Sequence, residues 1–397
     1  MSNPNIFISA GEASGERYGA MLIDAVRRRV PGATFFGLGG RAMESAGCER
    51  IVRAEDIAVM GITEVVRHMP EIYRKYRQLV QSIRARKPDA AVLIDFPDVN
   101  FRLARELKKL GVPVIYFVSP QIWAWKKHRV RWVRERVTKM LVIFPFEESY
   151  YREHGVDAEF VGHPLADLPR PGMTREEFAA RHGLNPAKEW IGLLPGSRAR
   201  ELRLNLPGMV AAAKELGPRY EYVLPAAATL DADWVRKTVA EIAAGCATIH
   251  VVEDARAVLG YARGSIVASG TATVEAALIG NPFIVVYRLS ALSYAMASRL
   301  VKLPHVAMAN LIAGKRIVPE LIQNEFTADN VVRELKPLLA DGERRSTMME
   351  ELAGVRAALH VPGDETRTAI ERAADWVVGY VEPQSGTLSA AASKANE

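Results

Sequence analysis

The sequence predicts an α/β protein of two doubly wound parallel-sheet domains. Short apolar runs alternate with longer amphipathic segments, the pattern of parallel strands covered by helices on both faces. This alternation occurs in two series, separated by a segment rich in Pro and Gly at residues 162–173 that we expect to be a hinge. A length of 397 residues also suits two domains of ~100–200 residues each. Because ligands bind beyond the carboxyl ends of such strands, we expect the site in a crevice between the domains.

The first series runs from residue 5 to residue 144. Residues 18–29 are followed by Pro31-Gly32, which would end a helix there. Residues 70–86 carry apolar side chains at helical spacing, so both segments are predicted helices. In the segment at 89–94 every residue after Asp89 is apolar, as in a buried strand. The predicted strands are 5–9, 34–38, 89–94, 112–118 and 140–144, and the predicted helices are 18–29, 70–86, 101–110 and 126–137.

The second series repeats the pattern from residue 190 to residue 287. Its predicted strands are 190–194, 220–224, 248–252, 264–268 and 282–287, and its predicted helices are 206–216, 232–244, 255–262 and 272–279. A further helix is expected around residues 369–380.

Composition excludes several classes of protein. With 49% apolar and 25% charged residues the chain is ordinary globular protein, neither disordered nor fibrous. Its two cysteines, Cys48 and Cys246, form no C-x-x-C motif, and no other ligand cluster has metal-binding spacing, so neither a metal nor a cofactor is predicted. We expect no secretory signal and no spanning helix, and hence a soluble or membrane-surface protein.

The charge balance favours anionic partners. The net charge is +6 and the pI about 9.2. Residues 67–87 and residues 126–139 each hold seven Lys or Arg against one Glu, and Trp125 and Trp132 lie within or beside the second run. Such a run is equally well explained as the solvated face of a helix.

The turn after the first strand is a candidate binding loop. It comprises Gly11, Glu12, Ala13, Ser14 and Gly15, directly before a helix. Glycines let backbone N–H groups approach a ligand closely, and the carboxylate of Glu12 suits sugar hydroxyls better than phosphate. A tight turn with a helix cap is the simpler alternative.

Carboxylates also follow the strand at residues 89–94. Asp95 comes at once after it, and Asp98 and Asn100 follow. A general base is expected at the carboxyl end of a buried strand, and we favour Asp95 for this role. Asp98 and Asn100 could instead cap the helix predicted from Phe101.

Two turns in the second series suit a diphosphate. Arg198, in the sequence LPGSR, offers a planar fork to phosphate oxygens. Ser269, Gly270 and Thr271 lead into a helix whose N-terminus attracts anions, and Glu275 lies one turn later, within reach of a ribose diol. The alternative is a capping role for Thr271 or Thr273, with Glu275 and Glu201 as surface residues. His163, beside Pro164, is more simply a structural residue than a catalytic one.

Taken together in order along the chain, nine blocks resemble the lipid-A-disaccharide synthase family. The blocks are GEASG at 11–15, VMGITEV at 59–65, IDFPDVN at 94–100, YFVSPQIWAW at 116–125, FPFE at 144–147, FVGHP at 160–164, LPGSR at 194–198, ASGTATVE at 268–275 and NLIAG at 310–314. The resemblance extends from about residue 6 to about residue 325.

This resemblance implies the GT-B architecture, two Rossmann-like domains facing a cleft. It implies an inverting, metal-independent glycosyltransferase without a cofactor. The enzyme would transfer 2,3-diacylglucosamine from UDP-2,3-diacylglucosamine to 2,3-diacylglucosamine 1-phosphate (lipid X). The products would be the β-1,6-linked lipid A disaccharide 1-phosphate and UDP.

Site roles follow from the same resemblance. Asp95 matches the family's proposed base. Arg198 and the helix start at residues 269–271 would bind the UDP phosphates, and Glu275 the ribose. Glu12 and Asn310 match further polar positions of the cleft. Glu16 stands where the family usually has Asp, which leaves its own role open.

The resemblance also suggests a domain plan and a location. Residues 1–167 would form an acceptor-binding and membrane-associating domain, joined by a C-terminal helix near 362–382; residues 168–361 would bind the UDP-sugar, and residues 383–397 would be a disordered tail. Apolar residues near the start of the first basic run would contact membrane or acyl chains: Met60, Ile62, Val65, Val66, Met69, Ile72 and Tyr73. This places the enzyme in the cytoplasm, on the cytosolic face of a Gram-negative inner membrane and its anionic lipids, without a nucleic-acid partner. Monomer and homodimer both stay open.

Two other functions stay open as alternatives. One is a UDP-sugar epimerase or hydrolase, because GT-B-like folds also host these. The other is a basic membrane-binding or nucleic-acid-binding protein, whose binding would depend steeply on salt.

Overall fold

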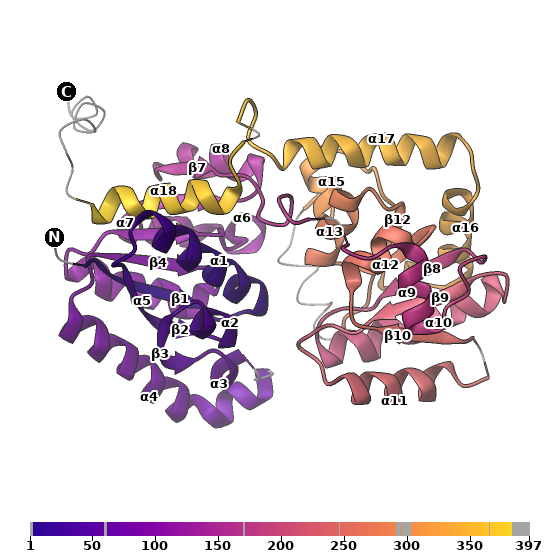
Figure 1. Ribbon diagram of the computed structural model, residues 1–397, viewed down its shortest axis with the longest axis horizontal. Coiled ribbons are helices and arrows are strands. Elements are labelled where there is room, and N and C mark those ends of the chain that lie inside the picture. The colour runs from indigo at the N-terminus through magenta and orange to yellow at the C-terminus, as the bar shows by residue number, and fades with distance from the viewer. Residues whose placement is uncertain are drawn as a thin grey trace. The chain divides into compact units, whose positions relative to one another are not determined.

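The chain folds into two compact units, each with its own sheet. The computed structural model describes residues 3–58, 62–169, 171–245, 247–290, 294, 303–364 and 366–382, with only the backbone path at 57–58 and 62–69. Unit 1 comprises Met1–Pro164 and His360–Glu397, and unit 2 comprises Leu165–Leu359 (Figure 1). The boundary at Pro164 lies within the segment at 162–173 that we expect to be a hinge.

Unit 1 contains a seven-stranded parallel sheet in the order β3-β2-β1-β4-β5-β6-β7. Its strands are β1 (Asn5–Ala10), β2 (Thr34–Gly39), β3 (Cys48–Arg53), β4 (Ala90–Ile94), β5 (Val114–Phe117), β6 (Lys139–Val142) and β7 (Ala158–Phe160). Its helices are α1 (Ala13–Arg29), α2 (Arg41–Ser45), α3 (Glu55–Ala58), α4 (Ile62–Arg86), α5 (Pro97–Lys109), α6 (Ile122–Trp125), the 3₁₀ turn η1 (Lys127–Arg129), α7 (Val130–Arg136), α8 (Pro145–Glu153) and α18 (Ala369–Val381).

Unit 2 contains a six-stranded parallel sheet in the order β10-β9-β8-β11-β12-β13. Its strands are β8 (Trp190–Leu194), β9 (Glu221–Pro225), β10 (Ile249–Val252), β11 (Gly264–Ala268), β12 (Phe283–Tyr287) and β13 (Glu320–Ile322). Its helices are α9 (Arg175–His182), α10 (Ala199–Leu216), α11 (Ala232–Ala243), α12 (Ala255–Tyr261), α13 (Thr271–Ile279), α15 (Met308–Ala313), the 3₁₀ turn η2 (Gln323–Glu325), α16 (Ala328–Leu339) and α17 (Glu343–Ala358).

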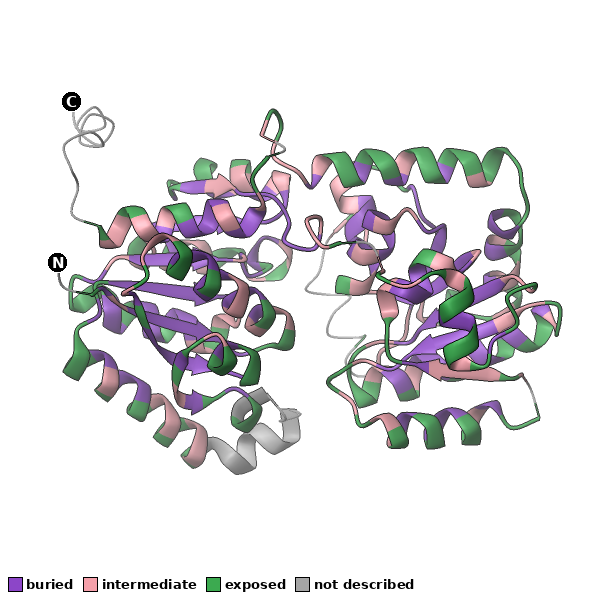
Figure 2. Ribbon diagram, viewed as in Figure 1, coloured by how far each residue is buried: buried purple, intermediate pink, exposed green. Residues whose placement is uncertain are grey.

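The strands form because apolar runs bury both faces. The central strands β1 and β4 are buried almost throughout, and the helices present exposed outer faces in Figure 2. Phe7, Phe101 and Tyr116 centre the core on one face of the first sheet. Trp190 and Phe178 anchor a smaller cluster in unit 2. The predicted fold class, two Rossmann-like doubly wound sheets of the GT-B kind, is confirmed.

The sequence pattern misses short edge strands and places four helix starts too late. β3, β7 and β13 lie at sheet edges, where only one neighbour and partial burial leave a weak apolar signal. Helices α1 and α5 begin four or five residues before the predicted starts at 18 and 101, and α4 and α10 begin seven or eight residues before those at 70 and 206. Helices α4 and α10 continue through a proline, Pro70 or Pro207, which the sequence pattern treats as a boundary.

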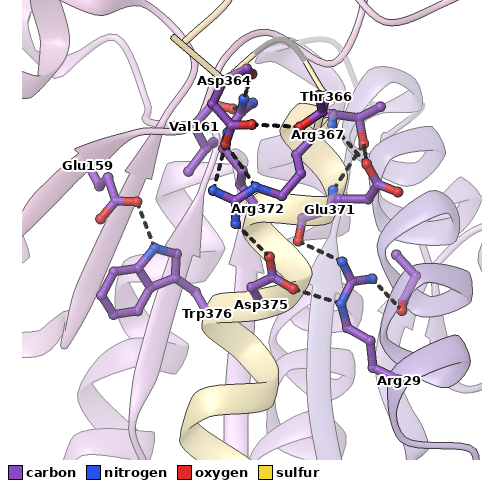
Figure 3. A network of polar contacts seen from close by, with 12 residues as sticks. Arg29, Glu159, Val161, Asp364, Thr366, Arg367, Glu371, Arg372, Asp375 and Trp376 are labelled. Carbon is purple, nitrogen blue, oxygen red and sulfur yellow. Dashed lines mark hydrogen bonds and ion pairs between the residues drawn. The ribbon is translucent and has the colours of Figure 1, made fainter. Parts of the chain in front are cut away.

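Helix α18 completes unit 1 from the far end of the chain. It packs against α1, and Arg29 Nε donates to Asp375 Oδ1 at 2.7 Å across 346 residues of sequence (Figure 3). The buried Arg372 donates to the carbonyl of Val161 at 3.2 Å and to the side chain and carbonyl of Asp364. Trp376 Nε1 donates to Glu159 Oε1 at 2.9 Å. These bonds explain why a C-terminal segment belongs to the N-terminal unit.

Some sequence predictions fall on residues outside this description. Met60 is one of them, and of Ile62, Val65, Val66 and Met69 only the backbone in α4 is described. The tail at 383–397 also lies outside the described residues. No helix in the described ranges is both long enough and apolar enough to span a bilayer.

Candidate active site

Each sheet reverses its strand order once, and the predicted site residues lie at these two switch points. In unit 1 the reversal falls between β1 and β4; in unit 2 it falls between β8 and β11. Loops on either side of a switch point turn away from each other and leave a crevice at the carboxyl ends of the strands. The predicted residues at or just beyond these ends are Gly11, Glu12, Ser14 and Gly15 after β1, Asp95 and Asp98 after β4, Arg198 after β8, and Ser269, Gly270, Thr271 and Glu275 after β11.

Asp95 has an unusual backbone that neighbouring side chains hold in place. Its φ is 44° and that of Phe96 is 47°, both in the left-handed region that few non-glycine residues adopt. The carbonyl of Asp95 accepts from Tyr116 Oη at 2.5 Å and from Asn100 Nδ2 at 2.8 Å. Burial raises the pKa of Tyr116 well above its usual value, so this hydroxyl stays a donor. The strand therefore ends abruptly in a turn whose backbone is held at Asp95.

The loop after β1 packs against this turn. A Cβ at Gly11 would lie 2.6 Å from Phe96 Cε1, so only glycine lets Phe96 lie over the β1 end. Glu12 is the exposed N-cap residue of α1, and its side chain makes no capping bond. Ser14 is half-buried and Gly15 is buried against Ile94. The simpler alternative, a tight turn with a helix cap, therefore describes the position of Glu12 but leaves its side chain without a capping bond.

Asp98 and Asn100 do not cap a helix. Helix α5 begins at Pro97 with Phe96 as its N-cap residue, so the capping alternative is wrong for both residues. Asp98 Oδ1 instead pairs with Arg129 Nη1 at 2.9 Å, and the Asp98 side chain is 71% exposed. Asn100 is fully buried and accepts from Ser9 Oγ at 2.7 Å while donating to the carbonyls of Ile94 and Asp95.

Glu16 acts outside the predicted loop. Its Oε1 accepts from the backbone N–H of Ala42 at 2.7 Å, in the first turn of α2. This carboxylate caps a neighbouring helix, a role that depends on tertiary contacts and that the sequence pattern leaves open.

The turn after β8 is organised by a glutamate. Glu201 Oε2 accepts from the N–H of Ser197 at 3.1 Å, and Glu201 Oε1 lies 3.4 Å from Arg198 Nη1. Gly196 has φ 122°, and a Cβ there would come within 2.7 Å of Glu201 Cβ. The Arg198 side chain is 68% exposed at the N-cap of α10. Glu201 is therefore not a mere surface residue, since it holds the turn that presents Arg198.

The turn after β11 leaves a helix start without a side-chain cap. Gly270 is the N-cap residue of α13, so the alternative in which Thr271 or Thr273 caps this helix is wrong. Thr273 is buried, and its hydroxyl donates back to the carbonyl of Gly270 at 2.7 Å. The N–H of Ser269 donates to Val286 at 3.1 Å. Glu275 lies in the next turn of α13 and is half-buried.

Asn310 is a fully buried residue of α15 whose amide group is occupied. Its Nδ2 donates to the carbonyl of Val318 at 3.0 Å and to Glu320 Oε1 at 2.8 Å. Its Oδ1 accepts from the N–H groups of Ile317 and Val318. With both donors and both lone pairs satisfied, its side chain positions the segment that leads into β13.

Sequence reasoning missed one buried asparagine brace, Asn205, the counterpart in unit 2 of Asn100. It donates to the carbonyl of Pro195 at 2.9 Å and accepts from the N–H of Arg288 at 2.9 Å. It thereby ties the end of β8 to the end of β12, as Asn100 ties β1 to β4. A lone asparagine at an inward position of a helix after a strand is the signal that could have found it.

Two buried titratable groups lie near the strand ends of unit 1. Burial raises the pKa of Glu147 to about 7, although Trp123 Nε1 donates to it at 3.0 Å and the N–H of Phe144 at 3.2 Å. Burial lowers the pKa of His163 to about 3, and its ring centroid lies 5.3 Å from that of Phe144. A histidine that stays neutral at physiological pH in the core is a poor proton shuttle. Within the described ranges, no group of three or more His, Cys, Asp or Glu side chains suits a metal ion.

Comparison with known proteins gives the family. The profile of the family described as lipid-A-disaccharide synthetase matches residues 6–372. The lipid-A-disaccharide synthase of Acidobacterium capsulatum is 62% identical, over 94% of this chain and 96% of that protein. Those of Koribacter versatilis and Myxococcus xanthus are 51% and 43% identical, over 95% and 93% of this chain and 98% and 97% of theirs.

Solved structures agree on the fold. The glycotransferase of kitacinnamycin has a TM-score of 0.64 at 16% identity, over 96% of this chain and 99% of that chain. A putative UDP-N-acetylglucosamine 2-epimerase from Listeria monocytogenes has a TM-score of 0.60 at 14% identity, over 94% of each chain. These two similarities concern architecture only. The family profile and the closely related sequences go further: the chain belongs to the lipid-A-disaccharide synthase family.

Proposed function

We propose that this protein makes the lipid A disaccharide by a single displacement. The 6-hydroxyl of 2,3-diacylglucosamine 1-phosphate attacks the anomeric carbon of UDP-2,3-diacylglucosamine. The new C–O bond forms as the bond to UDP breaks, the configuration inverts to β, and the hydroxyl proton passes to a base. Family membership over residues 6–372 is the observation that carries this proposal.

Asp95 is the proposed base. It follows β4 directly, and the two bonds to its carbonyl, from Tyr116 and Asn100, fix the turn that bears it. A base must lie within hydrogen-bond reach of the proton that it removes, and a rigid strand end supplies such placement.

Unit 2 supplies the proposed site for the leaving group. The uncapped start of α13 at residues 269–271 and the guanidinium of Arg198 would stabilise the charge that develops on the diphosphate, without a metal ion. Glu275 would bind the ribose hydroxyls. Asn310 would hold the neighbouring segment rather than contact the nucleotide, because its amide is fully engaged.

The lipid substrates place this chemistry at a membrane surface. The basic face of α4 and the net charge of +6 support attachment to the anionic cytosolic face of the inner membrane. We extend the proposal to residues 1–167 as the acceptor-binding and membrane-associating part and residues 168–361 as the donor-binding part. A homodimer is compatible with it.

The first test follows UDP release and lipid product with UDP-diacylglucosamine, with and without lipid X, in EDTA. Disaccharide that needs lipid X and tolerates EDTA is the expected result. UDP release without lipid X would indicate the hydrolase or epimerase instead. No turnover by folded protein in detergent would favour the binding protein.

The Asp95→Asn variant tests the base. We expect transfer to fall by about 10²–10⁴-fold while UDP affinity and fold are retained. Asp24→Asn, which removes an exposed carboxylate on α1, is the matched control and should retain full activity. Near-normal transfer by Asp95→Asn would remove Asp95 from this role and make Asp98 the next candidate.

A further inference from the structure

The second basic run, at residues 126–139, has no role in the proposal above. Its first part follows β5, the strand next to β4, and the N–H of Asp95 donates to the carbonyl of Phe117 at the end of β5 at 3.2 Å. The segment containing α6 and η1 therefore begins a few residues after the strand end that pairs with the proposed base. It carries Lys126, Lys127 and Arg129, and Arg129 pairs with the carboxylate of Asp98.

One tryptophan of this segment is buried and anchors it, and another is exposed. Trp123 is buried and donates to the buried Glu147 at 3.0 Å, which fixes α6 to α8. Trp125, two residues on, is 47% exposed, and Lys126 Nζ lies 3.8 Å from the centroid of its ring. An ammonium group held over an indole face is kept in one place at little further entropic cost.

The guanidinium of Arg129 has a nitrogen, Nε, without a hydrogen-bond acceptor among the described residues. The Arg129 side chain is only 14% exposed. Its Nη1 forms an ion pair with Asp98 Oδ1 at 2.9 Å, and the guanidinium lies 5.4 Å from the ring centroid of Trp132. Its Nε is buried, and none of the described residues accepts a hydrogen bond from it. Arginine has five N–H donors, and a donor left without an acceptor is costly. The Nε side of a guanidinium is one of the edges that binds phosphate at two points.

We infer that Lys126 and Arg129 bind the phosphate monoester of the acceptor lipid. The inference rests on the proposed function, in which the acceptor is a sugar 1-phosphate. On that sugar the phosphate is attached to C1 and the attacking hydroxyl to C6, which C5 bears, and C1 and C5 are the two carbons that flank the ring oxygen. A cation pair on the segment that follows the strand next to the base is therefore well placed for the phosphate. Asp98 orients Arg129 through an ion pair at Nη1 and leaves the Nε side of the guanidinium for the phosphate.

The surroundings of Lys126 act on its protonation in both directions. Burial is the largest influence and lowers the pKa of Lys126, Asp98 raises it, and the positive charge of Arg129 lowers it. A bound phosphate dianion would favour the protonated form, and it is attracted by both cations, so the pair binds it more favourably than either cation does alone.

The test compares two acceptor lipids in neutral detergent micelles with the full-length protein. One is 2,3-diacylglucosamine 1-phosphate and the other is the same lipid without phosphate. Binding is followed by tryptophan fluorescence, for which the exposed Trp125 serves as reporter, and kcat/KM is measured where turnover occurs. The quantity of interest is the ratio of the two Kd values.

We expect Arg129→Gln and Lys126→Gln each to lower the preference for the phosphorylated lipid by about 10-fold or more. The KM for UDP-diacylglucosamine should not change. Arg131→Gln removes an exposed cation of the same run and is the matched control, which should keep the preference. Arg129→Lys should restore part of it, since the charge returns without the fork.

Three results would overturn the inference. Equal loss with both lipids would mean that Arg129 only positions Asp98. An equal effect of Arg131→Gln would mean that diffuse charge, not a site, attracts the acceptor. Weaker binding of Arg129→Gln to phosphatidylglycerol vesicles, with an unchanged preference in micelles, would assign these cations to membrane headgroups. Wild-type protein that makes no disaccharide but still prefers the phosphorylated lipid would refute the proposed function alone.

Discussion

At the scale of single residues, the turn at Asp95 shows how buried neighbours hold a carboxylate. Two consecutive left-handed residues, Asp95 and Phe96, cost about 1–3 kcal/mol each unless their surroundings compensate. Tyr116 and Asn100 supply that compensation through the Asp95 carbonyl.

Tyr116→Phe should lower kcat about 10-fold with little change in KM, because the loosened turn misplaces the base. It should also lower the free energy of unfolding by about 1–2 kcal/mol, the cost of a lost buried hydrogen bond. Steady-state kinetics and denaturant unfolding would measure both.

Tyr222→Phe is the matched control for this prediction. Tyr222 in unit 2 is equally buried, and its hydroxyl oxygen lies 2.8 Å from the carbonyl oxygens of both Ala213 and Gly217, which share its one hydrogen. We expect a similar loss of stability and an unchanged kcat. If the two variants lose kcat alike, the Tyr116 bond has no special part in placing Asp95.

Glu147 makes stability depend on pH in a direction that can be worked out. Burial raises its pKa in the folded protein to about 7, from 4.5 in the unfolded chain. Below pH 4.5 Glu147 is protonated in both the folded and the unfolded protein. As the pH rises above 4.5 the unfolded protein loses this proton first, so the free energy of unfolding falls. The fall continues until the folded protein also loses the proton, near pH 7. From pH 5 to pH 8 this amounts to about 2–3 kcal/mol.

Glu147→Gln should therefore remove this slope from the free energy of unfolding and be the more stable protein at pH 8. The difference between wild type and variant cancels the opposite contribution of His163, which favours the folded state as pH rises to 6.5. Glu106 serves as control: its hydrogen bonds to Lys109 and Arg84 lower its pKa, so Glu106→Gln should change stability by a constant amount over this range. Parallel pH profiles of wild type and Glu147→Gln would contradict the prediction.

At the scale of elements, α18 is the clearest case of a helix held by specific polar bonds. Arg372, with 8% of its side chain exposed, joins α18 to the end of β7 through Val161 and to Asp364 (Figure 3). Removing one member of such a buried group leaves the other members without partners.

Arg372→Met, which keeps the length and the packing of the side chain, should lower the free energy of unfolding by about 2–4 kcal/mol. Arg367→Met is the control, because Arg367 pairs with the same Asp364 but is 54% exposed, and its loss should matter much less. Denaturant unfolding of both variants measures the difference. Equal effects would show that charge near Asp364, and not the buried bridge, holds α18.

Elements also explain which predictions from sequence succeeded. The central strands and the turns that follow them are encoded locally, by apolar runs that end in Gly, Asp or Ser, so the candidate residues at strand ends could be named in advance. The edge strands β3 and β13 and the helix starts before Pro70 and Pro207 could not, because their stability comes from neighbours rather than from their own composition.

At the scale of the whole molecule, the net charge of +6 predicts a salt-dependent attachment to anionic lipid. Binding to phosphatidylglycerol vesicles should fall steeply between about 50 mM and 500 mM salt, and neutral phosphatidylcholine vesicles should bind weakly at both. Vesicle co-sedimentation measures this.

The double variant Arg74→Gln with Arg77→Gln, on α4, should weaken vesicle binding about 30-fold, because each cation near the surface contributes about 1 kcal/mol. Arg236→Gln with Arg333→Gln removes the same charge from exposed positions in unit 2. If this pair weakens binding as much, overall charge rather than the α4 face attracts the protein to lipid.

The sequence by itself determined the α/β class, the two series of strands, the strand-end candidates and the resemblance to one enzyme family. These depend on local pattern: apolar period, turn residues and short motifs. Only the tertiary structure decided that Asn100 reaches Ser9 across 91 residues, that Glu16 caps α2, that Arg129 pairs with Asp98, and which bonds hold α18 to the rest of unit 1. Each is a contact between segments distant in the chain, and no local pattern encodes which partner a buried polar group will find.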